Sequence, residues 1–437
     1  MKILVLTNLY PPHHAGTYDF RCQTVTEALC SRGHQVRVLT SSHGLKVEQR
    51  GEEVERRLQL NGVFDHAPVT RYGELRDLET ANHAALREAL ERFRPDLIHV
   101  WSLAGLSKSL IFALRQSRLP TVYDVADDWL AAGIRHDPWL RWWNDPGGNL
   151  PRSALELSGQ RNRLDVLAPT RLMKGYERLP DVYGAGAAAG NVAPNSIAAF
   201  RFDRLYFCSQ SLKDETERAG FRVNHAEVIP PGIATQLYIG DIKPAAAPME
   251  RFLVVSRLTR ASGVLTAVKA LRLAHHNRIQ ASLSIYGKGD SDYIAELRSF
   301  VATNQLPVEF LSVSDIHRDL PAVYRGHDAL IYTVEWNEPY SLTPLEAMAC
   351  GLPVIGTTLG GAGELLRPGE NAWTYTAGSA EELAARLQEL QRQPALRCQM
   401  AEHAQQEIQS FHNESAVTDR IENYLNTSLE VWQHTAS

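Results

Sequence analysis

Residues 329–357 read ALIYTVEWNEPYSLTPLEAMACGLPVIGT, in which apolar runs at 329–333 and 353–357 flank a short helical pattern at 344–350. Short apolar runs bounded by glycine or proline are typical of buried strands. A strand, a helix and a second strand in succession predict one unit of a parallel sheet with a right-handed crossover. This stretch therefore indicates an α/β fold.

The same alternation occurs in two series along the chain, joined by a predicted linker at 235–249. Strands of the first series are predicted at 2–7, 35–40, 97–101, 121–124, 205–209 and 227–230, with helices at 19–32 and 106–116. Strands of the second series are predicted at 251–256, 281–286, 308–311, 329–333 and 353–357, with helices at 264–274, 292–304, 344–350, 380–391, 396–411 and 415–431. Two such sheets predict two Rossmann-like domains that face each other across a cleft, with ligands at the carboxyl ends of the strands.

The composition is that of a globular protein and argues against several kinds of partner. The 437 residues are too many for one ordinary core, and 44% hydrophobic and 22% charged residues are usual for a soluble chain. A net charge of −5 gives no electrostatic reason to expect nucleic acid as a partner. Five scattered cysteines without a CxxC pair predict a reduced, cytoplasmic compartment. The first residues, MKILVL, fit a buried strand better than a signal peptide.

Two glutamates, Glu338 and Glu346, lie eight positions apart around the short helix at 344–350. Thr343 is a good N-cap, Pro344 suits the first helical position, and Glu346 then lies where a capping-box glutamate would. A capping role alone can therefore explain why a glutamate stands at position 346. Glu338 precedes a proline in the approach loop, so it has no capping role and is the stronger candidate for binding a ligand.

The start of this helix also offers a site for an anion. The N–H groups of residues 342–345 have no partners within the helix, and the helix dipole adds positive potential there. A carboxylate accepts hydrogen bonds from vicinal hydroxyl groups. A carboxylate beside an anion site therefore predicts a ligand with both phosphate and hydroxyl groups, such as a sugar nucleotide.

The glutamate pair resembles the E-x7-E signature of retaining glycosyltransferases with the GT-B fold, in particular family-4 glycosyltransferases. Four further motifs are similar to that family: GGAGE at 360–364, PGENAW at 368–373, VIPPGI at 228–233 and YPPHHAG at 10–16. The resemblance covers nearly the whole chain except residues 130–199. It implies an N-terminal acceptor domain at 1–240, a C-terminal nucleotide-sugar donor domain at 248–414, and a last helix at 415–437 that packs back on the first domain.

The resemblance also implies roles for individual residues. Glu338 would contact hydroxyls of the donor sugar, Glu346 would bind the ribose diol, and Arg257 would stabilise charge on the diphosphate. The residues assigned to catalysis are Glu338, Arg257 and Asp124. The residues assigned to the donor are Gly16, Arg257, Ser262, Gly287, Lys288, Glu338, Tyr340, Ser341, Leu342, Thr343 and Glu346. The residues assigned to the acceptor are His13, His14, Tyr123 and Asp127.

Some of these residues depart from the family pattern or have a simpler explanation. Ser262 stands where the family usually carries a lysine, so one cation is missing unless Arg260 or another residue supplies it. Tyr123 replaces a histidine that often precedes the aspartate, and a phenol is a poor general base, so a polar sugar contact is expected. The segment Gly287-Lys288-Gly289 lacks the third glycine of a dinucleotide loop and also fits a plain strand-to-helix turn.

Residues 130–199 interrupt the alternation of strands and helices. They hold Trp139, Trp142 and Trp143 among arginines, and a run of small residues, GAGAAAG, at 184–190. One interpretation is a helical insertion with a mobile loop. The alternatives are an acceptor-binding lid or a membrane-surface patch, since tryptophan beside arginine suits an interface. A peripheral position at the inner face of the plasma membrane is the matching prediction for location.

The resemblance thus implies a retaining, metal-independent glycosyltransferase that uses a UDP- or GDP-sugar and no cofactor. The acceptor would be a carbohydrate, a lipid-linked saccharide or a small molecule, as in polysaccharide, glycolipid or natural-product glycoside synthesis. Asp124, Asp127 and Asp128 could bind a cation, but solvated or hydrogen-bonded roles are favoured. The alternatives are a non-catalytic sugar-nucleotide-binding subunit, suggested by Ser262, and another GT-B enzyme such as a phosphorylase.

Overall fold

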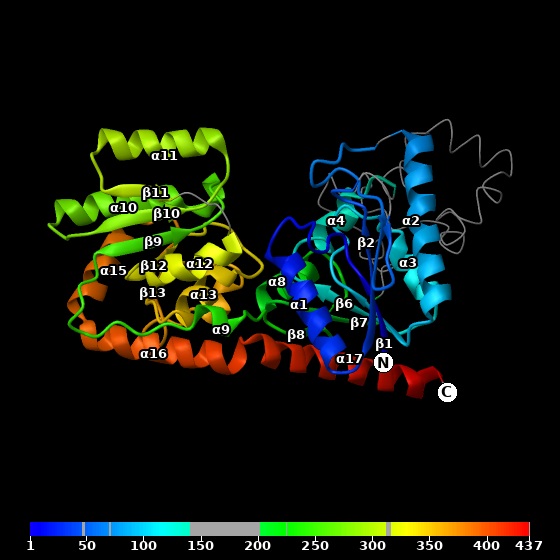
Figure 1. Ribbon diagram of the computed structural model, residues 1–437. Coiled ribbons are helices and arrows are strands. Elements are labelled where there is room, and N and C mark those ends of the chain that lie inside the picture. Colours follow the sequence, from blue (N-terminus) through cyan, green and yellow to red (C-terminus); the bar gives the residue numbers. More distant parts are fainter. Residues whose placement is uncertain (46–48, 70, 140–201, 224, 312–315, 437) are drawn as a thin grey trace. The chain divides into compact units, whose positions relative to one another are not determined.

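The computed structural model describes residues 1–45, 49–69, 71–139, 202–223, 225–311 and 316–436. It divides into two compact units (Figure 1). The first comprises Met1–Cys208, Leu212–Ile229 and Thr418–Ser437, and the second comprises Ser209–Ser211 and Pro230–Val417. Most of the expected insertion, with Trp142, Trp143 and the GAGAAAG run, lies outside the described residues. Within the described part, helix α4 spans Ala131–His136, and Trp139 is buried.

The first unit is built on an eight-stranded sheet of order β3-β4-β2-β1-β5-β6-β7-β8, in which every pair is parallel except β3 with β4. The strands are β1 (Lys2–Leu6), β2 (Gln35–Ser41), β3 (Gln49–Arg50), β4 (Val54–Leu58), β5 (Leu97–Val100), β6 (Thr121–Val125), β7 (Arg204–Phe207) and β8 (Glu227–Val228). The main helices are α1 (Thr17–Ser31), α2 (Tyr72–Phe93), α3 (Leu110–Gln116), α8 (Gln210–Arg218) and α17 (Glu414–Ala436).

The second unit is built on a six-stranded, fully parallel sheet of order β11-β10-β9-β12-β13-β14. Its strands are β9 (Arg251–Val255), β10 (Ser282–Tyr286), β11 (Val308–Leu311), β12 (Ala329–Tyr332), β13 (Val354–Gly356) and β14 (Trp373–Thr374). Its helices are α9 (Thr235–Tyr238), the 3-10 turn η2 (Arg260–Ser262), α10 (Val264–His276), α11 (Ser291–Thr303), α12 (Ile316–Arg325), α13 (Leu342–Ala349), α14 (Ala362–Leu365), α15 (Ala380–Arg392) and α16 (Pro394–Phe411). The predicted α/β class with two parallel sheets is confirmed.

The strands and helices predicted from apolar periodicity are present, with ends displaced by a few residues. The prediction omitted several elements, among them α2, α12, β4, β14 and the short α9, which lies in the predicted linker. In α2 the buried residues Leu75, Leu78, Leu86 and Ala89 do follow a helical period, so the signal existed. Strand β4 carries no such hydrophobic pattern, because Val54–Leu58 reads VERRL. Its charged side chains are buried because they pair with other groups.

Helix α17 packs against the sheet of the first unit from Thr418 onward. The Tyr424 hydroxyl donates a hydrogen bond to the Leu205 carbonyl at 2.8 Å, and Glu422 forms an ion pair with Arg32 at 2.6 Å. Ile421 and Leu425 are fully buried. Among the described residues, no helix is long and apolar enough to cross a bilayer.

Candidate functional site

The loops after β9, β10 and β12 come together at the carboxyl edge of the second sheet. The Leu258 N–H donates to the Lys288 carbonyl at 2.9 Å, which joins the first two loops. The Glu335 N–H donates to the Ala261 carbonyl at 2.9 Å, which joins the first and third. Because these strands are adjacent and parallel, this edge is where a ligand of an open α/β sheet is expected.

Glu338 lies in the loop between β12 and α13, half-buried, and its carboxylate is held by a tyrosine. The Tyr332 hydroxyl donates to Glu338 Oε2 at 2.6 Å. Burial raises the pKa of Glu338, and the Tyr332 and Ser341 hydroxyls and the Arg257 charge lower it in part. Arg257 itself is exposed. The structure therefore brings a carboxylate, a guanidinium and the first residues of α13 into one neighbourhood.

Helix α13 begins at Leu342, two residues earlier than the predicted start at Pro344, and this corrects the capping scheme. Ser341 is the N-cap, with φ −101° and ψ 133°, and Leu342 is the first helical residue. Thr343 is therefore not the N-cap, and Glu346 does not form a capping box. Proline is tolerated anywhere in the first turn, since no N–H there has an intrahelical partner, so Pro344 could not distinguish the two registers.

Glu346 is instead bound by two tyrosine hydroxyls. Tyr238 of α9 donates to its Oε1 at 3.0 Å, and Tyr324 of α12 donates to its Oε2 at 2.8 Å. The residue is 7% exposed, and burial raises its pKa to about 7 although both phenols lower it. The sequence did not predict these two contacts, because the three residues are far apart along the chain.

The residues around the expected lysine position are engaged elsewhere. The Ser262 hydroxyl donates to the Thr259 carbonyl at 2.5 Å inside η2, and the side chain is buried. Arg260 forms an ion pair with Glu296 at 2.6 Å on the surface. Lys288 is exposed on the loop after β10. Lys288 lies next to the Arg257 loop and, unlike Arg260, forms no ion pair within the described residues.

Gly287 and Tyr340, both assigned to the donor from the sequence, pack closely against other parts of the second unit. A side chain at Gly287 would overlap the Ser256 carbonyl, so glycine allows the loops after β9 and β10 to approach closely. Tyr340 is half-buried, and its ring lies 6.4 Å from the His412 ring.

In the first unit, the expected residues of the loop after β1 surround the start of α1. Gly16 is the N-cap, and its N–H donates to the Asp19 carboxylate at 3.2 Å. The His14 ring packs 4.3 Å from the Phe20 ring. His13 lies so close to Gly44 that any side chain there would overlap it.

Two of the residues expected in this unit are buried in the core. Asp124 is 0% exposed, accepts a hydrogen bond from the Tyr18 hydroxyl at 2.8 Å and pairs with Arg21 at 2.8 Å. Tyr123 is 2% exposed and stacks edge-on with Phe202, with ring centroids 5.0 Å apart. These positions do not support the catalytic role expected for Asp124 or the acceptor contact expected for Tyr123.

Asp127 remains partly exposed beyond β6. It accepts hydrogen bonds from the Trp129 N–H at 2.8 Å and from the Ser102 hydroxyl at 3.3 Å. Burial raises its pKa to about 7. Within the described residues, no group of three or more His, Cys, Asp or Glu side chains is arranged to hold a metal ion.

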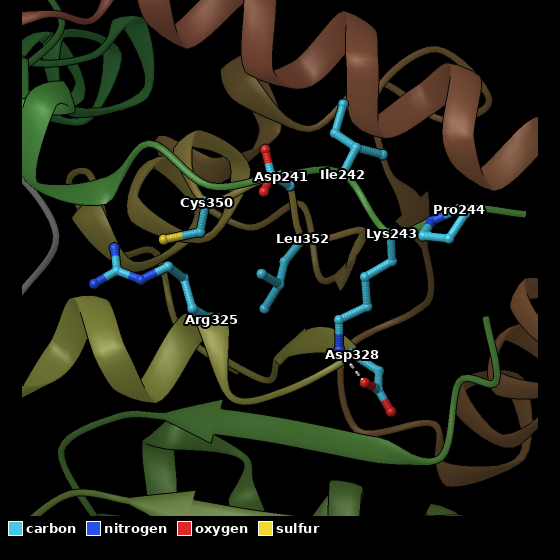
Figure 2. A pocket seen from close by; sticks show the side chains of 9 residues that line it. Asp241, Ile242, Lys243, Pro244, Arg325, Asp328, Cys350 and Leu352 are labelled. Carbon is cyan, nitrogen blue, oxygen red and sulfur yellow. Dashed lines mark hydrogen bonds and ion pairs between the residues drawn. The ribbon is translucent and has the colours of Figure 1, made fainter.

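A separate cavity of about 300 Å³ lies at the opposite edge of the second sheet, where β12 and β13 begin (Figure 2). Figure 2 shows Lys243 paired with Asp328, and the Arg325 side chain extending toward Cys350. The cavity is distinct from the Glu338 loop. Its two acidic and two basic side chains balance, so it shows no excess charge that would select an ionic ligand.

Comparison with known proteins places both units in the same group of enzymes. Residues 16–147 match the model of a glycosyl transferase 4-like domain, and residues 243–407 match that of glycosyl transferases group 1. A glycogen synthase of Mycobacterium tuberculosis (strain CDC 1551 / Oshkosh) is 30% identical over 97% of this chain and 94% of its own length. A D-inositol 3-phosphate glycosyltransferase of Rhodococcus opacus is 30% identical over 43% of this chain and 40% of its own length.

Solved structures share the fold at low sequence identity. Sucrose-phosphate synthase from Thermosynechococcus elongatus has a TM-score of 0.66 at 19% identity, with all of both chains covered. The Anabaena protein Alr3699/HepE, solved in complex with UDP-glucose, has a TM-score of 0.63 at 20% identity, with 98% of this chain and all of the other covered. These likenesses show the GT-B fold for the chain.

Proposed function

The chain belongs to the glycosyl transferases group 1 family, and from this premise we propose that it moves a sugar from a nucleotide-diphosphate sugar to a hydroxyl acceptor. We assign the donor site to Glu338, Arg257 and the first turn of α13. The observation that carries the proposal is the common neighbourhood of these three groups, in which Arg257 and Ser341 both act on the Glu338 carboxylate.

The chemistry of the reaction explains why these groups belong together. When the bond between sugar and diphosphate breaks, negative charge grows on the leaving phosphate oxygen. Arg257 and the unpaired N–H groups of Leu342 and Thr343 are fixed donors for that charge. Glu338 accepts hydrogen bonds from sugar hydroxyls, which holds the anomeric carbon in place.

We further propose that the transfer retains the anomeric configuration and needs no metal ion. No protein nucleophile is assigned, so the acceptor would attack from the face that the diphosphate leaves, with a phosphate oxygen taking its proton. Arg257 and the helix N–H groups would supply the stabilisation that a divalent cation supplies elsewhere. Proton NMR of the product at early times checks retention, since an inverted anomeric signal would contradict it.

The donor is proposed to be a UDP- or GDP-sugar, and the acceptor a carbohydrate, a lipid-linked saccharide or a small molecule. The UDP-glucose in the Anabaena neighbour and the inositol phosphate in the name of the Rhodococcus relative make these the first compounds to try. A non-catalytic sugar-nucleotide-binding subunit is the second candidate, because the Ser262 hydroxyl is engaged inside η2 and offers no cation.

The experiment is a panel of UDP-, GDP- and ADP-sugars incubated with the protein and an acceptor mixture, with free nucleoside diphosphate measured. We expect release with at least one donor, and faster release when a suitable acceptor is present. Binding of a donor without hydrolysis or transfer under any condition would favour the non-catalytic subunit. The absence of binding by every donor would contradict both candidates.

A further inference from the structure

The Glu346 carboxylate lies at the meeting point of three helices that are distant in sequence. We propose that Tyr238 and Tyr324 are positioning residues that hold Glu346 as a hydrogen-bond acceptor for the two ribose hydroxyls of the nucleotide. This inference rests on the proposed function and adds to it two residues that act through Glu346.

The geometry places the carboxylate beside the phosphate-binding turn. A helical side chain leans toward the N-terminus of its helix, so Glu346 covers the turn that holds Leu342 and Thr343. The Tyr324 hydroxyl also lies 3.5 Å from the Thr343 carbonyl, which puts this phenol at the same turn. A ribose bound through its diphosphate to α13 would therefore lie within reach of Glu346.

The number of acceptor sites on the carboxylate matches the proposed ligand. An ionised carboxylate has about four lone-pair sites on two oxygens. Tyr238 takes one on Oε1 and Tyr324 takes one on Oε2. One site on each oxygen is left for a vicinal diol, which donates two hydrogen bonds in parallel.

Both phenols stay protonated near neutral pH, because burial raises the pKa of both well above its usual range. Each therefore keeps an O–H to donate to Glu346, and these two hydrogen bonds favour its ionised form. Burial acts in the opposite direction and raises the pKa of Glu346 to about 7. Without one phenol the carboxyl group would hold its proton to a higher pH and would lose acceptor capacity near neutrality.

Other titratable groups near Glu346 belong to the helices packed around it. Cys350 is the C-cap of α13. Burial raises the pKa of its thiol to about 12, the charge of Arg325 on α12 lowers this pKa in part, and the charge of Glu346 raises it. Glu414 raises the pKa of Tyr238 together with Glu346. On α16, Arg397 donates to backbone carbonyls, and Glu407 pairs with Arg367.

The test compares nucleotides that differ only in the ribose diol. UDP and 2′-deoxy-UDP, and GDP and 2′-deoxy-GDP, are titrated by calorimetry between pH 5.5 and 8.5. The ratio of the deoxy to the ribo dissociation constant cancels the titration of the phosphates. We expect this ratio to be largest above pH 7 and to fall as the pH falls through about 7.

Tyr238→Phe and Tyr324→Phe should move the midpoint of this fall to higher pH and reduce the ratio at pH 7, by up to about fivefold for a midpoint shift from 7 to 8. Tyr424→Phe is the matched control, because it also removes one buried phenol hydrogen bond, to the Leu205 carbonyl in the first unit. It should leave both the ratio and its midpoint unchanged.

The outcomes separate this inference from the proposed function. If UDP or GDP binds but the ratio stays near one at every pH, Glu346 does not bind the diol and the inference is wrong. If the ratio depends on pH but neither tyrosine variant moves it, the tyrosines have no positioning role. The wild-type titration decides the first point even if a variant does not fold, whereas no binding of either nucleotide contradicts the proposed function itself.

Discussion

Glu338 and Glu346 differ more in their surroundings than in their sequence context. Glu338 is half-buried, bound by Tyr332 and close to Arg257, whereas Glu346 is buried between two tyrosines. Sequence reasoning selected both residues but gave Glu346 a capping role that the helix start at Leu342 rules out. The tyrosines could not be selected from the sequence, because only the tertiary fold brings them to the carboxylates.

A buried carboxyl group of the first unit makes stability depend on pH. Burial and the nearby Asp137 charge raise the pKa of Glu79 from 4.5 to about 8. The folded chain therefore keeps a proton that the unfolded chain releases near pH 4.5. The free energy of unfolding should fall between pH 5 and 8, by up to about 1.4 kcal/mol for each pH unit.

Glu79→Gln isolates this effect, because glutamine still accepts the hydrogen bond that the Ser109 hydroxyl gives to Glu79 at 2.5 Å. Urea unfolding of both proteins at several pH values measures the difference. We expect the fall with pH to be weaker in the variant. Parallel pH profiles for the two proteins would show that Glu79 titrates normally in the fold.

The loop after β13 determines where Glu338 lies. Gly360 has φ +61°, and a side chain there would overlap backbone atoms of Asn337 and Glu338. Gly360→Ala should therefore lower stability and also reduce donor turnover, since the Glu338 backbone must move. Thermal unfolding and nucleotide release measure the two effects.

Gly369→Ala is the matched control for this substitution. Gly369 has φ +77°, but a side chain there would meet no atom within 4 Å. Both variants carry the strain of an alanine at positive φ, and only Gly360→Ala should lose turnover beyond its loss of stability. Equal loss of turnover in the two variants would mean that the contact with Glu338 is unimportant.

Apolar periodicity predicts the strands and helices whose buried side chains are apolar. It predicted β9 and β12, whose residues are largely buried and aliphatic or aromatic. It failed for β4, where Arg56 donates to the Tyr10 carbonyl at 2.7 Å and Arg57 pairs with Glu88 at 2.9 Å. Burial achieved by pairing charges leaves no hydrophobic pattern in the sequence.

The two sheets of the whole molecule could be predicted from the sequence, because the strands occur in two separate series along the chain. The grouping of Thr418–Ser437 with the first unit depends on side chains of α17 that are buried there. Leu425→Ala should cost about 2–5 kcal/mol, because Leu425 is fully buried. Thermal unfolding measures this loss.

The same variant also tests the assignment of the nucleotide to the second unit. UDP or GDP affinity measured well below the unfolding temperature should stay at the wild-type value, since Arg257, Glu338 and α13 all belong to that unit. A large loss of affinity in the folded variant would contradict this assignment.

The most direct test of the central claim is the kcat/KM of nucleotide release for Glu338→Gln with the preferred donor. We expect a loss of about 100-fold or more relative to the wild type, as for the removal of one preorganised polar contact at a reacting centre. Glu381→Gln, which removes an exposed carboxylate from the first turn of α15 in the same unit, should keep wild-type activity. Wild-type kcat/KM in Glu338→Gln would contradict the account of the donor site.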